Sequence, residues 1–383
     1  MGKIVTGTLP NRTMELFIVY TPPNEIYTQW KLTPESGSPW SNNKRLFDNF
    51  VHAHDHSQDS FWERLFHPFQ QPSPAPLGGE QKFLITEVAV ESLKDKALQV
   101  FFIDGAKQRL LTMWKVSSAV EALWTEPQLF EPEPPFDIST ITAGTTAKGL
   151  LHLFALSSNG QLFSTWKTSL ASDASWAPWV RKPDIEGRTK ETKIAVGRTH
   201  NGQLNLWQVV EDRLMVSKKG MANIQAPWSK SRDFLSTRGN SSFKPTDVAV
   251  GPLSDDRLQL FFINNHQQLF TMWELPDDSV KITKLPEVQA SGNLDLEPPM
   301  MAEPFVMIPP DHKGWTAPTL FDPALPEEVG QITAMAAGRH ADGVLQLFAM
   351  TTGRGTITTW KESSDPNAPW MPWEIPPPPE FIH

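Results

Sequence analysis

The densest group of side chains that could do chemistry in this chain is a run of histidines. His52, His54 and His56 alternate along the sequence, and Asp55 lies among them. Alternate residues of an extended segment share one face, so the three imidazoles could gather a divalent metal ion. A solvated loop without a metal is the interpretation that we favour for this short histidine-rich stretch.

A second group is polar and stands at the starts of short strands rich in small and β-branched residues. Small side chains suit the crowded centre of a radial array, where neighbouring backbones approach closely. We expect a pocket at the mouth of such an array, and its predicted substrate-binding residues are Thr86, Glu87, Thr140, Thr192, Asp247 and Thr333. The alternative is that these polar residues hold water in an axial channel.

Two arginines and part of the histidine-bearing segment extend this predicted pocket. Arg198 and Arg339 each follow a glycine at the end of one of these strands. A guanidinium there could donate hydrogen bonds to a ligand oxygen or brace two neighbouring repeats, and we favour bracing. Phe61 and Trp62, together with His54, are predicted to form a lid over the pocket.

Most familiar catalytic patterns are missing from the sequence. There is no phosphate-binding loop, glycine-rich dinucleotide fingerprint, Gly-x-Ser-x-Gly elbow or His-Glu-x-x-His zinc motif, and there is no cysteine. We therefore predict no metal and no cofactor, and the catalytic residues stay unassigned.

Charge and hydropathy limit the partners. The net charge is −9, and lysines and arginines are scattered, so the basic surface that nucleic acid requires is not expected. No apolar run approaches the length of about 20 residues that a membrane-spanning helix needs, and residues 1–10 lack a secretory core. The expected location is cytoplasmic.

The elements that must position these residues repeat along the chain. A Phe or Trp marks an apolar strand six times, at steps of 84, 53, 53, 54 and 87 residues, in this order: Phe17, Phe101, Phe154, Trp207, Phe261 and Phe348. Counting from Phe348 through the last residue and back to Phe17 gives one more step of 52 residues. A period that closes on itself predicts a circular array in which the aromatics pack between repeats.

Each repeat reads as four short strands. After the small-residue strand and the aromatic strand, a third strand ends in Trp-Lys in most repeats, and a second Trp further on marks an outer strand. We therefore predict an all-β fold, a six-bladed β-propeller with four-stranded blades, in a single domain of residues 1–383.

Two long insertions, at about 41–84 and 275–314, interrupt the period. Long loops in a compact repeat are commonly functional. In the first, either Trp40 or Trp62 could mark the outer strand. With Trp62 both insertions would leave from the same face, and with Trp40 from opposite faces.

The phrases at 196–202 (VGRTHNG) and 337–343 (AGRHADG), each followed by the aromatic strand, resemble the repeats of lectin-type β-propellers. Bacterial propeller lectins and fungal fucose-specific six-bladed lectins share this pattern. The likeness covers nearly the whole chain outside the insertions and rests mainly on structural residues, so it implies a fold more than an activity.

In the fucose-lectin pattern, each sugar site combines an Arg of the second strand with a Glu of the third strand and nearby aromatic residues. Aligned to that pattern, the Arg position reads Glu15, Gln99, His152, Asn205, Gln259 and Gln346. The Glu position reads Thr28, Thr112, Ser164, Val216, Thr271 and Thr358. Since neither charge is kept, fucose binding at six equivalent sites is not expected.

Some fungal proteins similar to fucose lectins act as hetero-Diels–Alderases in natural-product biosynthesis. The resemblance therefore implies a cofactor-independent pericyclase that binds a hydrophobic small-molecule substrate and templates its cyclisation. The alternative is a carbohydrate-binding lectin with altered specificity, whose partner is a glycan. A third interpretation is a noncatalytic interaction scaffold.

Overall fold

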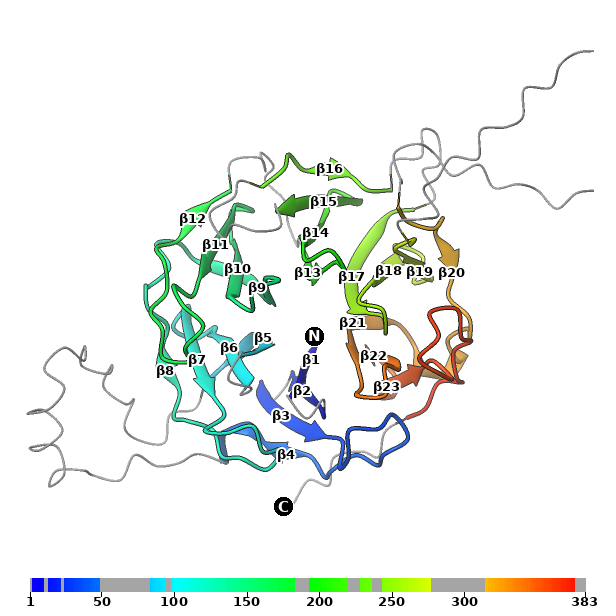
Figure 1. Cartoon of the computed structure of the whole chain (residues 1–383), viewed down its shortest axis with the longest axis horizontal. Coiled ribbons are helices and arrows are strands. Elements are labelled where there is room, and N and C mark those ends of the chain that lie inside the picture. Colours follow the sequence, from blue (N-terminus) through cyan, green and yellow to red (C-terminus); the bar gives the residue numbers. More distant parts are fainter. Residues whose placement is uncertain are drawn as a thin grey trace, which may run out of the picture.

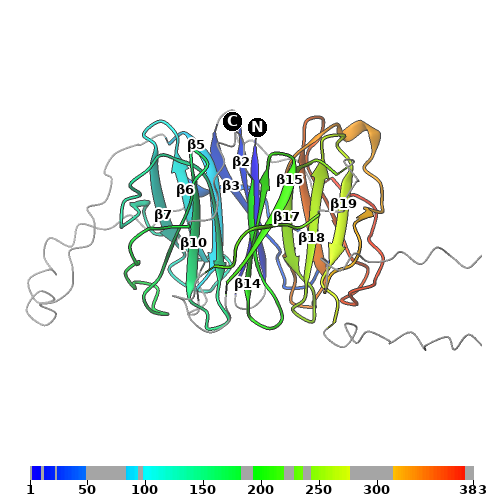
Figure 2. The ribbon, with the colours of Figure 1, turned by 90° about the horizontal axis from the view of Figure 1, so that it is seen from above.

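The computed structural model describes residues 2–9, 13–21, 24–48, 83–93, 98–182, 193–219, 228–235, 243–276 and 314–375. Within these ranges six antiparallel sheets surround a central axis (Figure 1), and two short segments form single turns of 3₁₀ helix. Figure 2 shows that the strands run along that axis. The predicted all-β, six-bladed propeller is confirmed. No helix of the described residues has the length and hydropathy of a membrane span.

Each blade is built from consecutive strands, with the innermost strand first. Blade 1 contains β1 (Lys3–Thr8), β2 (Met14–Tyr20), β3 (Glu25–Trp30) and β4 (Lys44–Arg45), and blade 2 contains β5 (Ile85–Ser92), β6 (Leu98–Asp104), β7 (Arg109–Trp114) and β8 (Gln128–Leu129). Blade 3 contains β9 (Ile138–Thr145), β10 (Leu151–Ser157), β11 (Leu162–Trp166) and β12 (Val180–Arg181).

Blade 4 contains β13 (Ile194–Arg198), β14 (Leu204–Val210), β15 (Arg213–Lys219) and β16 (Arg232–Asp233). Blade 5 contains β17 (Pro245–Pro252), β18 (Leu258–Asn264), β19 (Leu269–Trp273) and β20 (Thr319–Leu320), and blade 6 contains β21 (Ile332–Arg339), β22 (Leu345–Thr351) and β23 (Gly355–Trp360). Single bridges from Lys361 to Trp370 and from Thr358 to Glu374 add the fourth strand of blade 6. The 3₁₀ helices are η1 (Leu46–Asp48) and η4 (Glu327–Val329).

The second strand of each blade is buried on both faces because a blade packs on either side of it. Its aromatic ring meets the outer-strand Trp of the next blade edge-on, at centroid distances from 5.5 to 5.8 Å. The series ends with Phe348 of blade 6 against Trp40 of blade 1, at 5.6 Å. The aromatic repeat is thus a closed ring of contacts between blades, as the spacing predicted.

Trp40 marks the outer strand of blade 1. It bridges Lys31, and β4 then pairs with β3. The first insertion therefore begins later than residue 41, because residues 41–48 belong to blade 1. The second is held at its base by the Leu275 N–H, which donates to the Gly314 carbonyl at 2.7 Å. Since the first follows an outer strand and the second precedes one, they leave from opposite ends of the ring.

The ring closes where the first inner strand packs beside the last blade, as the sequence predicted. The Thr6 hydroxyl of β1 donates to the Ala337 carbonyl of β21 at 3.0 Å. A Cβ added to Gly338 would lie 2.9 Å from Thr6 Oγ1, so the two strands approach as closely as glycine permits.

A candidate binding site in the central channel

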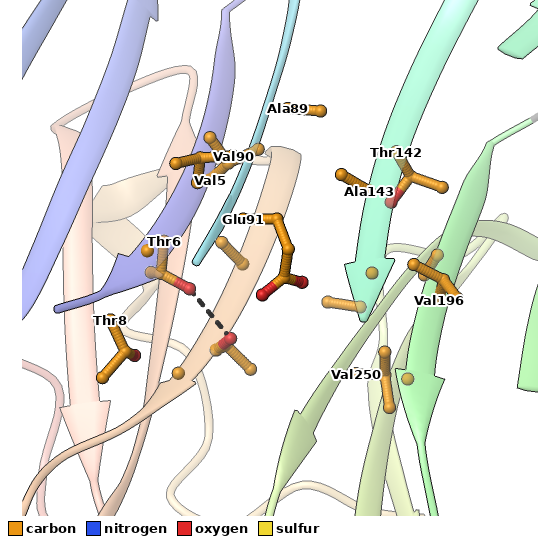
Figure 3. Close-up of a pocket in the computed structure, with 18 of the residues that line it drawn as sticks. Val5, Thr6, Thr8, Ala89, Val90, Glu91, Thr142, Ala143, Val196 and Val250 are labelled. Carbon is orange, nitrogen blue, oxygen red and sulfur yellow. Dashed lines mark hydrogen bonds between the residues drawn. The ribbon is translucent and has the colours of Figure 1, made fainter. Parts of the chain in front are cut away.

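The inner strands β1, β5, β9, β13, β17 and β21 surround a cavity of about 490 Å³. Its wall combines a band of small apolar side chains (Figure 3), among them Val5, Ala89, Ala143, Val196 and Val250, with an equally large share of polar and charged surface. This volume lies in the ordinary range for small-molecule sites. The channel can therefore hold one organic molecule between apolar and polar parts of its wall.

One residue interrupts an otherwise uniform layer of this channel. Strand register places a glycine at the same level in five blades, and the sixth position is Glu91; the glycines are Gly7, Gly144, Gly197, Gly251 and Gly338. The glycines allow the neighbouring blade to approach closely, because a Cβ added to Gly144 would lie 2.9 Å from Val196 Cγ1. Glu91 instead directs its carboxyl group into the cavity (Figure 3).

The surroundings of Glu91 hold its carboxyl group near its point of half-ionisation at neutral pH. Burial raises the pKa of Glu91 to about 7, although the Ser92 N–H and the charge of Arg198 act to lower it. The Ser92 N–H donates to Glu91 Oε1 at 2.9 Å. A carboxyl group in this state can donate or accept a hydrogen bond, and can give or take a proton.

The two predicted arginines lie at the same end of the cavity, which we call the Glu91 end. Arg198 donates to the Thr146 carbonyl of blade 3 at 3.3 Å. Arg339 donates to the Leu253 carbonyl and, at 2.7 Å, to Asp256 Oδ1 of blade 5. Both therefore link adjacent blades, as we favoured, and both also line the cavity.

The opposite end, which we call the Lys3 end, carries a charged layer. Lys3 Nζ lies 3.0 Å from Glu87 Oε2, and the Thr140 hydroxyl donates to the same oxygen at 2.8 Å. Burial acts to lower the pKa of Lys3, but the carboxylates of Glu87 and Asp247 outweigh burial and raise it. Burial raises the pKa of Asp247 against the opposing charges of Lys193 and Lys3. The Thr140–Glu87 hydrogen bond joins these two predicted residues of adjacent blades, and Asp247 lies across the ring in the cavity lining.

Of the predicted mouth residues that the structure describes, Asp247 lines the cavity, whereas Glu87, Thr140, Thr86 and Thr333 do not. Register shifts at Ile85/Glu87 and Ile332/Ala334 leave Thr86 and Thr333 in β-bulges. Thr86 is exposed, and the Thr333 hydroxyl donates to the Met350 carbonyl of its own blade at 3.3 Å. The bulges turn these two threonines away from the lining set.

Part of the predicted site lies outside the described residues. These residues are Thr192, Phe61, Trp62, His54 and the rest of the histidine run. Among the residues that are described, no group of three or more His, Cys, Asp or Glu side chains could hold a metal ion.

The positions aligned with the fucose-lectin charges are buried within the sheets. Gln99 donates to Thr112 at 2.9 Å, Gln259 to Thr271 at 2.8 Å, and Gln346 to Thr358 at 2.7 Å. In blade 1 the Thr28 hydroxyl donates to Glu15 at 2.7 Å. In these four blades the pair joins the second and third strands, so these positions form internal hydrogen bonds and do not face a ligand.

The sequence prediction did not include Glu91, which lines the cavity. It also missed Lys3 and Lys193 at the opposite end of the lining. The signal for Glu91 was present, because five of the six small-residue strands end in glycine at the aligned position and only the second does not.

Comparison with known structures agrees with this architecture. The chain is similar to the fungal lectin of Aleuria aurantia, a six-bladed β-propeller described with a novel fucose recognition mode. The similarity covers 99% of this chain and 97% of the lectin, at 9% identity and a TM-score of 0.55. AofleA from Arthrobotrys oligospora matches at 8% identity and a TM-score of 0.53, over 97% of this chain and 85% of that one.

An intramolecular trans-sialidase from Ruminococcus gnavus matches at 10% identity and a TM-score of 0.53, over 91% and 90% of the two chains. At this level of identity the likeness establishes the fold alone. No protein-family model and no curated protein matches the sequence. The resemblance to fucose-lectin propellers therefore holds at the level of the fold.

Proposed function

We propose that the protein binds one oxygenated, largely hydrophobic small molecule in its central channel and catalyses, without a cofactor, a hetero-Diels–Alder-type ring closure. The observation that carries this proposal is Glu91, one titratable group among five equivalent glycines. Six equivalent ligand sites would repeat their polar residues in every blade. A carboxyl group that lines the channel in one blade, where the other five have glycine, favours one specialised site.

The reaction needs little from the protein beyond position and one hydrogen bond. A heterodiene, C=C–C=O, adds to an alkene: one C–C bond and one C–O bond form, three π bonds become one, and no proton or electron is gained or lost. Negative charge grows on the heterodiene oxygen, so the protonated carboxyl group of Glu91 can stabilise it by donating a hydrogen bond. The apolar band around Val196 and Val250 can hold the alkene in contact.

The proposal is tested with a heterodiene generated in solution. An ortho-quinone methide is mixed with a panel of electron-rich alkenes, and the rate and enantiomeric excess of each chroman product are measured. We expect acceleration and enantiomeric excess with the native chain. Glu91→Gly, which matches the other five blades, should abolish both, and Glu91→Gln, which keeps a donor, should retain a large part.

Arg213 provides a matched control, because it lies on the outer surface paired with Glu211 at 3.2 Å. Arg213→Gln should behave like the native chain. Racemic products formed at the buffer rate across the whole panel would contradict the proposal.

The fold likeness to the Aleuria aurantia lectin supports a second candidate, the binding of a glycan. The buried pairs such as Gln99–Thr112 give this candidate no charged sugar contact at the aligned positions. A glycan array combined with an agglutination assay separates the two candidates. Saturable binding of a sugar at several sites per chain would favour the lectin.

A further inference from the structure

The Lys3 end of the channel repeats itself across the ring. Strand register places Lys3 and Glu87 at one level in blades 1 and 2, and Lys193 and Asp247 near that level in blades 4 and 5, which face them (Figure 1). Opposite blades thus carry the same charge. Lys3 pairs with Glu87 of the neighbouring blade, and the charge of Lys193 acts on Asp247 in the opposite half, so this layer has a sufficient structural role in joining the blades.

The Glu91 end breaks that correspondence at three positions. Glu91 faces the blade in which the equivalent residue is Gly251. At the next level, Arg198 stands opposite Thr8, and Arg339 stands opposite Thr145. Each departure adds a charged side chain to the cavity lining. All three lie at one end. Joining the blades explains the bracing bonds of Arg198 and Arg339, but it does not explain Glu91, whose described hydrogen bond is to Ser92 of its own strand.

The two guanidinium groups can bind a ligand while they brace the blades. Each guanidinium has five N–H donors in a planar fork that fits the two oxygens of a carboxylate or of an enolised dicarbonyl. The bracing bonds of Arg198 and Arg339 are donated by Nη1 of each guanidinium. Two such groups at the end of the cavity that also carries Glu91 favour a ligand with an acidic oxygen.

We propose that the Glu91 end recognises an acidic oxygen, ionised at neutral pH, on the molecule that the channel binds, and that Glu91 takes up a proton as that anion enters. This inference rests on the proposed function only in taking the channel as the ligand site. Carboxylates and enolates share the required chemistry.

The groups around Glu91 set the sign of the coupling. Arg198 and Arg339 are cationic, and Asp256 is held by Arg339 at 2.7 Å. Burial lowers the pKa of His340 to about 4, so this imidazole is neutral at pH 7. Two anions in contact cannot both stay ionised at low cost, so an incoming anion raises the pKa of Glu91 above its value of about 7. Affinity for the anion therefore falls as pH rises above 7.

The test is isothermal titration calorimetry of the full chain at pH 8. The probes are phenylbutanoate and an alkyl-substituted cyclohexanedione, each compared with its uncharged methyl ester or enol methyl ether. Titrations in phosphate and in Tris, which differ in ionisation enthalpy, count the protons taken up. At least one anion should bind about tenfold or more tightly than its neutral counterpart, with uptake approaching one proton.

Variants separate recognition from stability. Arg198→Gln should lose about tenfold in affinity for the anion. Arg198 is exposed and makes one brace, so a thermal melt should show that this variant still folds. Glu91→Gln should keep the affinity but take up no proton, and Arg213→Gln should match the native chain.

Equal affinity for anion and neutral counterpart, or binding without proton uptake, would overturn the inference. If neither anion binds but a neutral heterodiene still occupies the channel, the inference fails and the proposed function stands. If neither class of probe binds in the channel, both fail.

Discussion

At the residue scale, burial shifts the pKa values of two titratable groups in this propeller, Glu91 and His152, far from their usual values. Glu91 is a carboxyl group where the fold otherwise uses glycine, and burial raises its pKa to about 7. His152 is an imidazole at a position that is Gln in three other blades, with no exposed surface and no hydrogen-bond partner for either ring nitrogen. Burial, with Lys219 acting in the same direction, lowers its pKa to about 3. The two groups respond to pH in opposite directions.

Glu91→Gln should flatten part of the pH dependence of stability. The folded-state pKa of Glu91 lies above its unfolded value, so its contribution is present below about pH 4 and is lost as pH rises through 7. The native chain should lose up to about 3 kcal/mol relative to the variant between pH 5 and pH 8. Urea unfolding midpoints at the two pH values measure this, and parallel shifts in both proteins would contradict it.

His152→Gln should protect the protein from acid. Because the folded-state pKa of His152 is depressed, the stability of the neutral form is present above about pH 6.5 and is lost as pH falls toward 3. We expect the variant to be more stable than the native chain at pH 4.5 by up to about 2 kcal/mol. The comparison is a pair of thermal melts at pH 4.5 and pH 7.5; an unchanged difference at the two pH values is the adverse result.

At the element scale, a lysine at the end of the third strand pairs with the Trp of the outer strand in five of the six blades. Lys31 and Lys361 lie over Trp40 and Trp370 at 4.8 and 5.3 Å from the ring centroids. Lys115 is nearly fully buried, and its Nζ lies 2.7 Å from Glu15 Oε2 of the neighbouring blade. Blade 5 carries Glu274 at this place, bridged to Trp315. The Trp-Lys motif is therefore structural.

The two partners of the Lys115–Glu15 ion pair should differ in their cost when replaced. Lys115→Met leaves a buried carboxylate unpaired and should cost about 3–5 kcal/mol of the free energy of unfolding. Glu15→Gln should cost far less, because Gln99 already occupies the equivalent place in blade 2 with its bond to the threonine kept. Denaturant unfolding of both variants gives the comparison, and equal losses would show that the carboxylate is not the source of the cost.

At the scale of the whole molecule, the sequence predicted the ring but not the site within it. The repeated aromatic residues, among them Phe101, Phe154 and Phe348, pack against the outer strand of the next blade. Because this contact recurs once per blade, the spacing of the aromatics along the sequence was enough to predict the ring. The bulges that turn Thr86 and Thr333 aside depend on strand register, which spacing alone does not reveal. Glu91 was not predicted as a cavity residue because it is unusual only by comparison with five glycines of other blades. The closed ring brings these six positions to one level.

The most direct test of this account is a crystal structure with the chroman product of the proposed cyclisation bound. We expect one product molecule per chain, inside the central channel, with its ring oxygen within hydrogen-bond distance of the Glu91 carboxyl group. Product molecules seated between blades around the rim, with the channel holding only water, would contradict it.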